Sequence, residues 1–231
     1  MSLHDPDHAA AIAALDLFDG LPATALAEVC ARAHIRALAH GARTFDQGEP
    51  VERAHVLLSG AVRIAQAGSD GGEVVLRFIG PGEIFGSVAI FTDRRYPADG
   101  IAMTESVEVS WDHAVWHGLI ERHPRIALNL IGIVGHRLAE LQDRVREMAT
   151  QRTDRRIANT LLRLARQAGR PTRNGTEIGF PLRRKDIADI AGTTLYTVSR
   201  TLNAWERDGL IAGRRRLTLI SMAGIEQIAA G

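Results

Sequence analysis

The sequence contains a single cysteine, Cys30, among its 231 residues. One thiol forms no intramolecular disulfide and cannot supply a four-cysteine iron–sulfur or zinc site. No apolar run reaches the roughly 18 residues of a membrane-spanning helix, so we expect no membrane partner. The stretch from Met1 to Ala14 lacks the basic segment of a secretory signal. We therefore expect a cytoplasmic protein whose Cys30 thiol is buried and inert.

A strong net charge is absent from the whole chain, which has 28 Arg or Lys residues against 27 Asp or Glu. The charge is nevertheless segregated. Residues 151–231 hold 15 basic and 7 acidic residues, a net of +8, whereas the first 150 residues hold 13 and 20, a net of −7. A basic C-terminal third favours a nucleic-acid footprint confined to one domain, although a solvated surface with chance segregation is the alternative.

A glycine turn at Gly192 separates two short segments with helical periodicity. The first runs from Leu182 to Ala191, and its apolar positions lie on one face. The second follows Thr193 and Thr194, whose hydroxyl groups suit the start of a helix. Two short helices joined in this way are typical of a helix-turn-helix, whose second helix fits a major groove about 12 Å wide. The sequence therefore predicts DNA binding.

Short β-type runs separated by glycines occupy the stretch from about Ile35 to Trp111. This spacing predicts an antiparallel roll or barrel. Before it, residues 12–34 are expected to form a helix. The runs are Ala54 to Leu58, Ala61 to Ala65, Glu73 to Ile79 and Ser106 to Trp111. The expected buried positions of the helix are Ala13, Leu17, Leu21, Leu26, Val29 and Cys30.

A long helix is predicted after Pro124. Apolar residues recur in it with alternating spacings of four and three, the pattern of a coiled-coil seam over three heptads. A second stripe, Ile126, Leu130 and Ile133, is placed to pack on the roll. Two stripes favour a parallel dimer over an ordinary amphipathic helix in a monomer. The predicted seam is Ile131, Val134, Leu138, Leu141 and Val145, flanked by Ala127 and Met148.

Beyond Met148 the helical pattern breaks near Thr150 to Thr153. Thr153 or Asp154 is placed to cap a further helix from Arg156 to Gln167. After the second helix of the helix-turn-helix, Arg214 to Ile220 is expected to form a basic β-wing whose arginines meet phosphates.

The order of these motifs resembles that of the CRP/FNR family of bacterial transcription regulators over nearly the whole chain. The resemblance rests on Gln47-Gly48, on Gly80 to Gly86, on Arg183 to Ala188 and on Thr197 to Arg200. It implies an α+β fold, with a cyclic-nucleotide-binding-like antiparallel β-roll, a long dimerisation helix and a C-terminal winged helix-turn-helix. The implied domains are residues 1–123, 124–150 and 151–231. It also implies a homodimer on a palindromic operator, with RNA polymerase as a partner.

The same resemblance assigns roles in DNA binding. Ser199 and Arg200 match the base-reading end of the recognition helix, where an arginine pairs with guanine O6 and N7. The expected backbone contacts are Thr194, Thr197, Arg183 and Arg184.

One position in the recognition helix departs from the family pattern. The family usually has Glu four residues before the base-reading arginine, but here the position is Tyr196. A phenol can stack, touch a thymine methyl group or donate to a phosphate, but it is a poor copy of a carboxylate. We therefore expect the operator half-site to differ from the usual one at the base pair that Tyr196 faces.

The family resemblance does not identify the effector. In the cyclic-AMP sensors of the family, a Phe-Gly pair is followed by a Glu that binds the ribose, and an Arg about ten residues later binds the phosphate. In this chain Ser87 stands in place of the Glu, and Pro97 stands in place of the Arg. A cyclic nucleotide is therefore not the expected effector. The candidate effector-pocket residues are Gly82, Phe85, Gly86, Ser87, Arg94 and Arg95.

Heme is one candidate effector. The segment from Arg95 to Ala102 is similar to the FNR-like members without a cluster, among them the heme-dependent nitric-oxide responders of the DNR and NnrR type. Histidine is a common axial ligand of heme, and the chain has nine: His4, His8, His34, His40, His55, His113, His117, His123 and His136.

Three functions are weighed. The first is a homodimeric regulator gated by a small molecule or a gas, and the second is a constitutive DNA-binding regulator without a gate. The third, an enzyme with a phosphate cradle at Gly80 to Gly86, is rejected because the sequence lacks a Walker lysine and any grouped metal-ligand motif.

Overall fold

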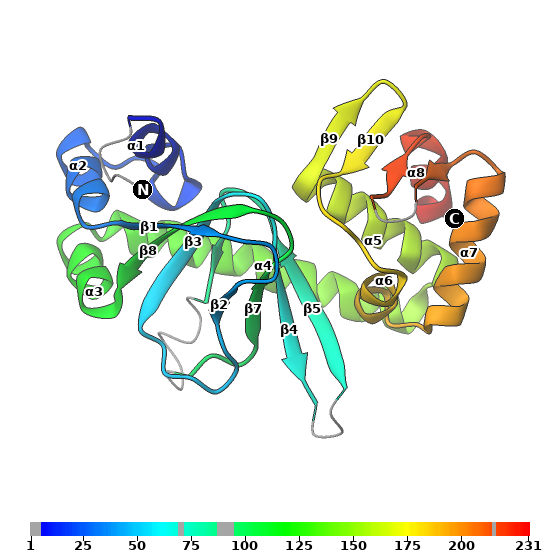
Figure 1. Cartoon of the computed structure of the whole chain (residues 1–231), viewed down its shortest axis with the longest axis horizontal. Coiled ribbons are helices and arrows are strands. Elements are labelled where there is room, and N and C mark those ends of the chain that lie inside the picture. Colours follow the sequence, from blue (N-terminus) through cyan, green and yellow to red (C-terminus); the bar gives the residue numbers. More distant parts are fainter. Residues whose placement is uncertain (1–5, 69–71, 87–94, 214–215) are drawn as a thin grey trace. The chain divides into compact units, whose positions relative to one another are not determined.

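The computed structural model describes residues 6–68, 72–86, 95–213 and 216–231 (Figure 1). The chain divides into two compact units. The first comprises residues 1–62 and 79–141, and the second comprises residues 63–78 and 142–231. The α+β class, the antiparallel roll, the long helix and the C-terminal winged helix-turn-helix agree with the prediction.

The first unit is built on antiparallel strands. One sheet has the strand order β1-β8-β3-β6, and β2 pairs with β7. Ala54 and Val56 lie opposite Trp111 and Val109, so that buried side chains face each other across β3 and β8. The strands of this unit are β1 (His34–Leu38), β2 (Arg43–Phe45), β3 (Arg53–Ser59), β6 (Ile84–Phe85), β7 (Asp99–Ala102) and β8 (Ser106–Asp112). The predicted strands at 54–58 and 106–111 are confirmed, whereas the short β1, β2, β6 and β7 were not predicted.

The predicted continuous helix over residues 12–34 is wrong. The chain forms α1 (Pro6–Ala13), a 3-10 turn (Asp16–Phe18) and α2 (Ala23–Ala31), and β1 then begins at His34. Gly20 has a positive φ of 73°, and Pro22, which has no amide N–H, precedes α2, so one helix cannot run through this stretch. Of the positions expected to be buried, Leu17 and Val29 are buried, Leu21, Leu26 and Cys30 are half-buried, and Ala13 is exposed.

Aromatic contacts fix these N-terminal helices to the roll. Phe18 packs edge-on against Trp111, with ring centroids 5.4 Å apart, and the Trp111 indole N–H donates to the carbonyl of Val29 at 2.9 Å. All three residues are buried. An indole is seldom buried without a partner for its N–H, and Val29 supplies one.

The long helix α4 (Arg125–Thr150) follows α3 (His113–Arg122). Ile126 and Leu130, from the stripe assigned to the roll, are buried. The residues of the predicted seam are exposed along the other face. Among the residues that the structure describes, no helix combines the length and apolar character needed to cross a bilayer.

The second unit contains the helix-turn-helix. Its helices are α5 (Thr153–Ala168), α6 (Arg184–Ala191), α7 (Leu195–Arg207) and α8 (Met222–Ala230). A sheet of order β11-β12-β10-β9 completes it, from β9 (Gly169–Thr172), β10 (Gly175–Ile178), β11 (Ile211–Ala212) and β12 (Thr218–Leu219). The residue that precedes α5 is Arg152, so the predicted cap at Thr153 or Asp154 is wrong. Arg214 and Arg215 of the predicted wing lie outside the described residues.

A β-hairpin of β4 (Val62–Ala67) and β5 (Glu73–Ile79) contributes residues 63–78 to the second unit. Both of its strands were predicted. Polar side chains of α6 hold its backbone, since Lys185 Nζ donates to the carbonyl of Glu73 at 2.8 Å and the Val75 N–H donates to Asp189 at 3.3 Å. The Phe78 and Phe180 rings pack 4.6 Å apart. The hairpin is therefore held to the first helix of the helix-turn-helix.

Removal of the Asp189 carboxylate should loosen β5. A hydrogen bond contributes about 1 kcal/mol, which is roughly a factor of five in an opening equilibrium. In Asp189→Ala, we expect the β5 amides to exchange about fivefold faster in hydrogen–deuterium exchange mass spectrometry. Asp208→Ala, at an exposed aspartate that follows α7, is the matched control. Unchanged exchange in β5 of Asp189→Ala would contradict this contact.

Candidate functional site

The turn between α6 and α7 is set by Gly192. Its φ of 61° and ψ of 48° are left-handed, a region that favours glycine. The N–H of Gly192 donates to carbonyls at the end of α6, and Thr193 donates to the carbonyl of Ala188 at 3.0 Å. These bonds close α6 at Ala191, and α7 begins three residues after Gly192, at Leu195.

Thr194 begins α7 as its N-cap. Its hydroxyl oxygen accepts the Thr197 N–H at 3.1 Å and lies 2.9 Å from the Thr197 hydroxyl oxygen. Both threonines, which were predicted to contact the DNA backbone, are thus engaged in the first turn of the helix. The remaining free N–H groups at a helix N-terminus favour an anion, so this end of α7 suits a phosphate.

One face of α7 is buried and the opposite face is exposed. Val198, Leu202 and Trp205 are buried against the rest of the unit. Their burial holds the helix by its apolar face. On the opposite side Tyr196, Arg200, Asn203 and Arg207, spaced by four, three and four residues, are all exposed. Ser199 is half-buried beside this stripe.

The two arginines at the start of α6 have different partners. Arg183 binds the buried carboxylate of Asp186 at 2.6 Å, and this hydrogen bond raises the pKa of the guanidinium. Arg184 Nη2 donates to Asn203 Oδ1 at 2.7 Å and therefore bridges α6 and α7. The backbone-contact roles expected for Arg183 and Arg184 stay predictions, but both side chains also have positions fixed within the protein.

Asn203 and Arg207 were not predicted from the sequence as DNA-contacting residues. They line a surface hollow together with Arg200 and Glu206. Their helical spacing from Tyr196 and Arg200 was the signal that would have found them, because residues three and four apart share a face.

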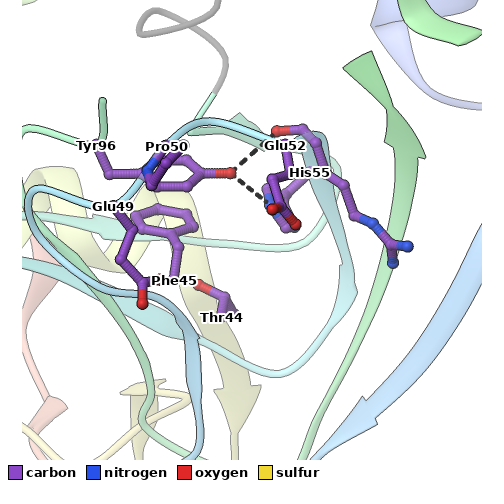
Figure 2. Close-up of a pocket in the computed structure, with 8 residues that line it drawn as sticks. Thr44, Phe45, Glu49, Pro50, Glu52, His55 and Tyr96 are labelled. Carbon is purple, nitrogen blue, oxygen red and sulfur yellow. Dashed lines mark hydrogen bonds between the residues drawn. The ribbon is translucent and has the colours of Figure 1, made fainter. Parts of the chain in front are cut away.

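A pocket of about 290 Å³ opens in the first unit (Figure 2). Among the residues that the structure describes, its lining contains none of the candidate effector residues. Glu49 and Glu52 are exposed at it, and the guanidinium of Arg53 is paired with Asp112 at 2.9 Å. The carboxylates make the pocket more favourable for a cation or a neutral ligand than for a phosphate. The lining residues are Thr44, Phe45, Glu49, Pro50, Glu52, Arg53, His55 and Tyr96.

The described candidate effector residues are not part of that lining, but Phe85 and Gly86 adjoin its aromatic residues. Phe85 is buried, and a Cβ on Gly86 would lie 3.0 Å from Phe45 and 3.1 Å from Tyr96. Gly82 is exposed at a turn. Arg95 donates to the carbonyl of Gly48 at 2.7 Å. Ser87 and Arg94 lie outside the described residues.

Aromatic side chains fill the space between the pocket and Gly86. Figure 2 shows the Phe45 and Tyr96 rings stacked on each other. Their centroids lie 4.0 Å apart, with an angle of 7° between the ring planes. Phe85 lies beside this pair, with its ring centroid 5.9 Å from that of Phe45. Tyr96 Oη donates to the carbonyl of Arg53 at 3.3 Å. A ligand in this part of the roll would therefore contact ring faces.

His55 links this cluster to a buried carboxylate. Its Nε2 lies 3.2 Å from Tyr96 Oη, and its Nδ1 lies 3.4 Å from Glu108 Oε2. Arg36 Nε in turn donates to Glu108 at 2.8 Å. His55 and Glu108 are both buried. A polar histidine within the apolar run from Ala54 to Leu58 was the sequence signal for this site.

Comparison with known proteins gives matches over both units. Residues 35–123 match the cyclic nucleotide-binding domain family, and residues 155–228 match the Crp-like helix-turn-helix domain family. A CRP-like cAMP-activated global transcriptional regulator of Mycobacterium tuberculosis is 26% identical over 210 residues, which is 91% of this chain and 94% of that protein. The chain belongs to the CRP/FNR family.

Further similarities agree with this membership. The nitrogen fixation regulation protein FixK of Azorhizobium caulinodans is 29% identical over 82% of this chain and 77% of that protein. The structure of FixK2 from Bradyrhizobium japonicum shares the fold, with a TM-score of 0.74 at 22% identity over 86% of this chain and 98% of that one. As a CRP/FNR-family protein, the chain is a DNA-binding transcription regulator with an effector-domain fold at its N-terminus.

The histidines proposed as heme ligands have varied surroundings in this CRP/FNR-family chain. His34 lies 3.1 Å from Asp112, and His123 lies 2.9 Å from Glu28. The His113 and His117 rings lie 4.6 Å apart on α3. His136 is exposed on α4, and His4 is outside the described residues. Heme binding stays a prediction. Burial raises the pKa of the Cys30 thiol, which disfavours the reactive thiolate.

The phenol of Tyr96 should lose its proton at a higher pH than an exposed tyrosine does. Burial raises its pKa to about 12, compared with about 10 in an unfolded chain. The neutral phenol therefore adds stability that is fully present below about pH 10 and lost as the pH rises to about 12. We expect the ultraviolet tyrosinate titration of the wild type minus that of Tyr96→Phe to have its midpoint near 12.

The chain has only two tyrosines, which makes the subtraction clean. Tyr196→Phe is the matched control and should leave the late step in place. A difference curve with its midpoint near 10 would show that Tyr96 is in contact with water.

Proposed function

We propose that this chain is a homodimeric regulator that binds a palindromic operator through α7 and responds to an effector held by the N-terminal roll. The observation that carries this proposal is the exposed face of α7, where Tyr196, Arg200, Asn203 and Arg207 stand over a buried apolar face. Such a face suits the major groove, in which arginine pairs with guanine.

The seam of α4 supports dimerisation. Ile131 is 66% exposed, Leu138 55% and Val145 62%. A soluble protein seldom leaves so regular an apolar stripe in water, and the heptad spacing suits a second copy of the same helix. Two copies would present two α7 helices to half-sites about one helical turn apart.

The hairpin of β4 and β5 supports gating. It leaves the roll at Val62 and returns at Ile79, and between these points α6 holds it through Lys185 and Asp189. Arg184 then joins α6 to Asn203 on α7. A shift of the hairpin would therefore reach the recognition helix through two sets of hydrogen bonds, which is the kind of element that an effector can bias.

For the effector, we favour a neutral or cationic small molecule in the pocket beside Tyr96. Glu49 and Glu52 at this pocket disfavour a cyclic nucleotide. Heme, with His55 as its axial ligand, would require the loss of the contacts of His55 with Tyr96 and Glu108. A regulator without a gate is the alternative, in which operator affinity does not depend on any effector. RNA polymerase is the proposed partner at the promoter.

Breaking the seam should abolish dimerisation and operator binding together. Leu138→Asp puts a charge in each copy of the seam, so we expect a monomer in sedimentation velocity. Its operator affinity should fall at least about a hundredfold, because the two α7 helices then bind independently. His136→Asp, at an exposed position on the same helix, should keep both properties. A monomeric variant that retained tight operator binding would refute the dimer.

Arg200→Ala should lower operator affinity by about 1–3 kcal/mol and remove the preference for guanine at one position of each half-site. Arg207→Ala should weaken all sequences alike and reduce the salt slope by about 1, as expected for a phosphate contact. Fluorescence anisotropy on single-base operator variants measures both. Arg166→Ala, an exposed arginine on α5, is the control. Retained guanine preference in Arg200→Ala would exclude the base-reading role.

A further inference from the structure

The N-terminal end of α7 exposes two large apolar side chains side by side in the sequence. Leu195 is 52% exposed and Tyr196 is 75% exposed. The other large apolar residues of this helix, Val198, Leu202 and Trp205, are buried. The packing of α7 against the rest of the unit therefore uses Val198, Leu202 and Trp205 rather than Leu195 and Tyr196.

The charge around this pair indicates what covers it. Tyr196 shares the exposed face of α7 with Arg200 and Arg207, and residues 151–231 carry a net charge of +8. A protein partner that covered Leu195 and Tyr196 would also have to neutralise these arginines. A DNA duplex supplies phosphates for the cations and base edges for the helix.

In the major groove, thymine alone presents a methyl group, while adenine, cytosine and guanine present only donors and acceptors. Leu195 has no polar side-chain atom. Placed against cytosine N4 or adenine N6, it would remove water from a donor and offer nothing in return. The same side chain gains contact area against a methyl group. Leu195 therefore favours thymine both by attraction and by exclusion of the other bases.

We propose that Leu195 and Tyr196 form an apolar edge that reads thymine methyl groups, and that each operator half-site carries thymines beside the guanine read by Arg200. This inference rests on the proposed function and adds the base class that this end of α7 selects. Measured along the helix axis, Tyr196 lies about 6 Å before Arg200, and Leu195 lies about 7.5 Å before Arg200. Because base pairs are spaced by about 3.4 Å, these thymines lie within about two base pairs of that guanine.

The test begins with selection of bound sequences from a random oligonucleotide pool. The full-length protein is used in clarified extract of the expressing cells, which supplies cellular metabolites. We expect half-sites that contain a guanine with thymines within about two base pairs of it. Single thymines of the selected operator are then replaced by deoxyuridine, which removes only the methyl group, and Kd is measured by fluorescence anisotropy at fixed salt.

Loss of one buried methyl should weaken binding about fourfold. In Leu195→Ala the deoxyuridine effect should vanish at one thymine, and in Tyr196→Ala at the other, while the guanine preference due to Arg200 persists. Leu76→Ala removes the same exposed group from β5 and should leave every deoxyuridine effect unchanged.

The outcomes separate this inference from the proposed function. Specific operators with no thymine near the guanine, or with no deoxyuridine effect, would overturn the thymine reading and leave a sequence-specific regulator. Equal deoxyuridine effects in the wild type and in Leu195→Ala and Tyr196→Ala would assign the methyl contacts to other residues and overturn it as well. If no sequence is enriched at all, the proposed function fails, and the inference fails with it.

Discussion

The buried carboxylate of Asp186 is the interaction on which the DNA-binding half depends. It accepts the backbone N–H of Arg183 at 3.0 Å and also binds its guanidinium, so the start of α6 is fixed around a paired charge. A buried carboxylate without such partners would be strongly destabilising. Because the start of α6 is fixed, the other polar side chains of this helix are held towards their partners. Lys185, the only lysine of the chain, and Asp189 contact the hairpin, while Arg184 contacts α7.

This arrangement gives α6 a role that a helix-turn-helix does not itself require. In a minimal motif, the first helix crosses the DNA backbone while the second enters the major groove. Here its polar side is shared between a hairpin that comes from the roll and the exposed face of the recognition helix. Because Asn203 Oδ1 is already engaged by Arg184, a movement of α6 also changes what the middle of α7 offers to a groove. In the proposed gating, α6 therefore both supports α7 and transmits the movement of the hairpin to it.

The sequence predicted best where one periodicity is sustained. The exposed apolar stripe of α4 and the buried face of α7 follow from spacing alone. Gly192 marked the turn because the left-handed backbone that closes α6 favours glycine. Prediction failed where tertiary context decides. Residues 12–34 carry enough apolar positions for one helix, but Gly20 and Pro22 break it. The short β2 and β6 have too few residues to show a period, and the partners of Arg183 and Arg184 depend on folding.

The candidate effector residues show why membership in the family leaves the ligand open. The glycines that carry the resemblance act through backbone geometry. A Cβ on Gly86, whose φ is 68°, would lie 3.0 Å from Phe45, and so this position favours glycine whichever ligand is bound. The chemistry of the pocket instead comes from the side chains of Phe45, His55, Tyr96 and Glu52. The residues that shape the backbone of the roll thus differ from those that line the pocket, and relatives can share the roll while they bind different molecules.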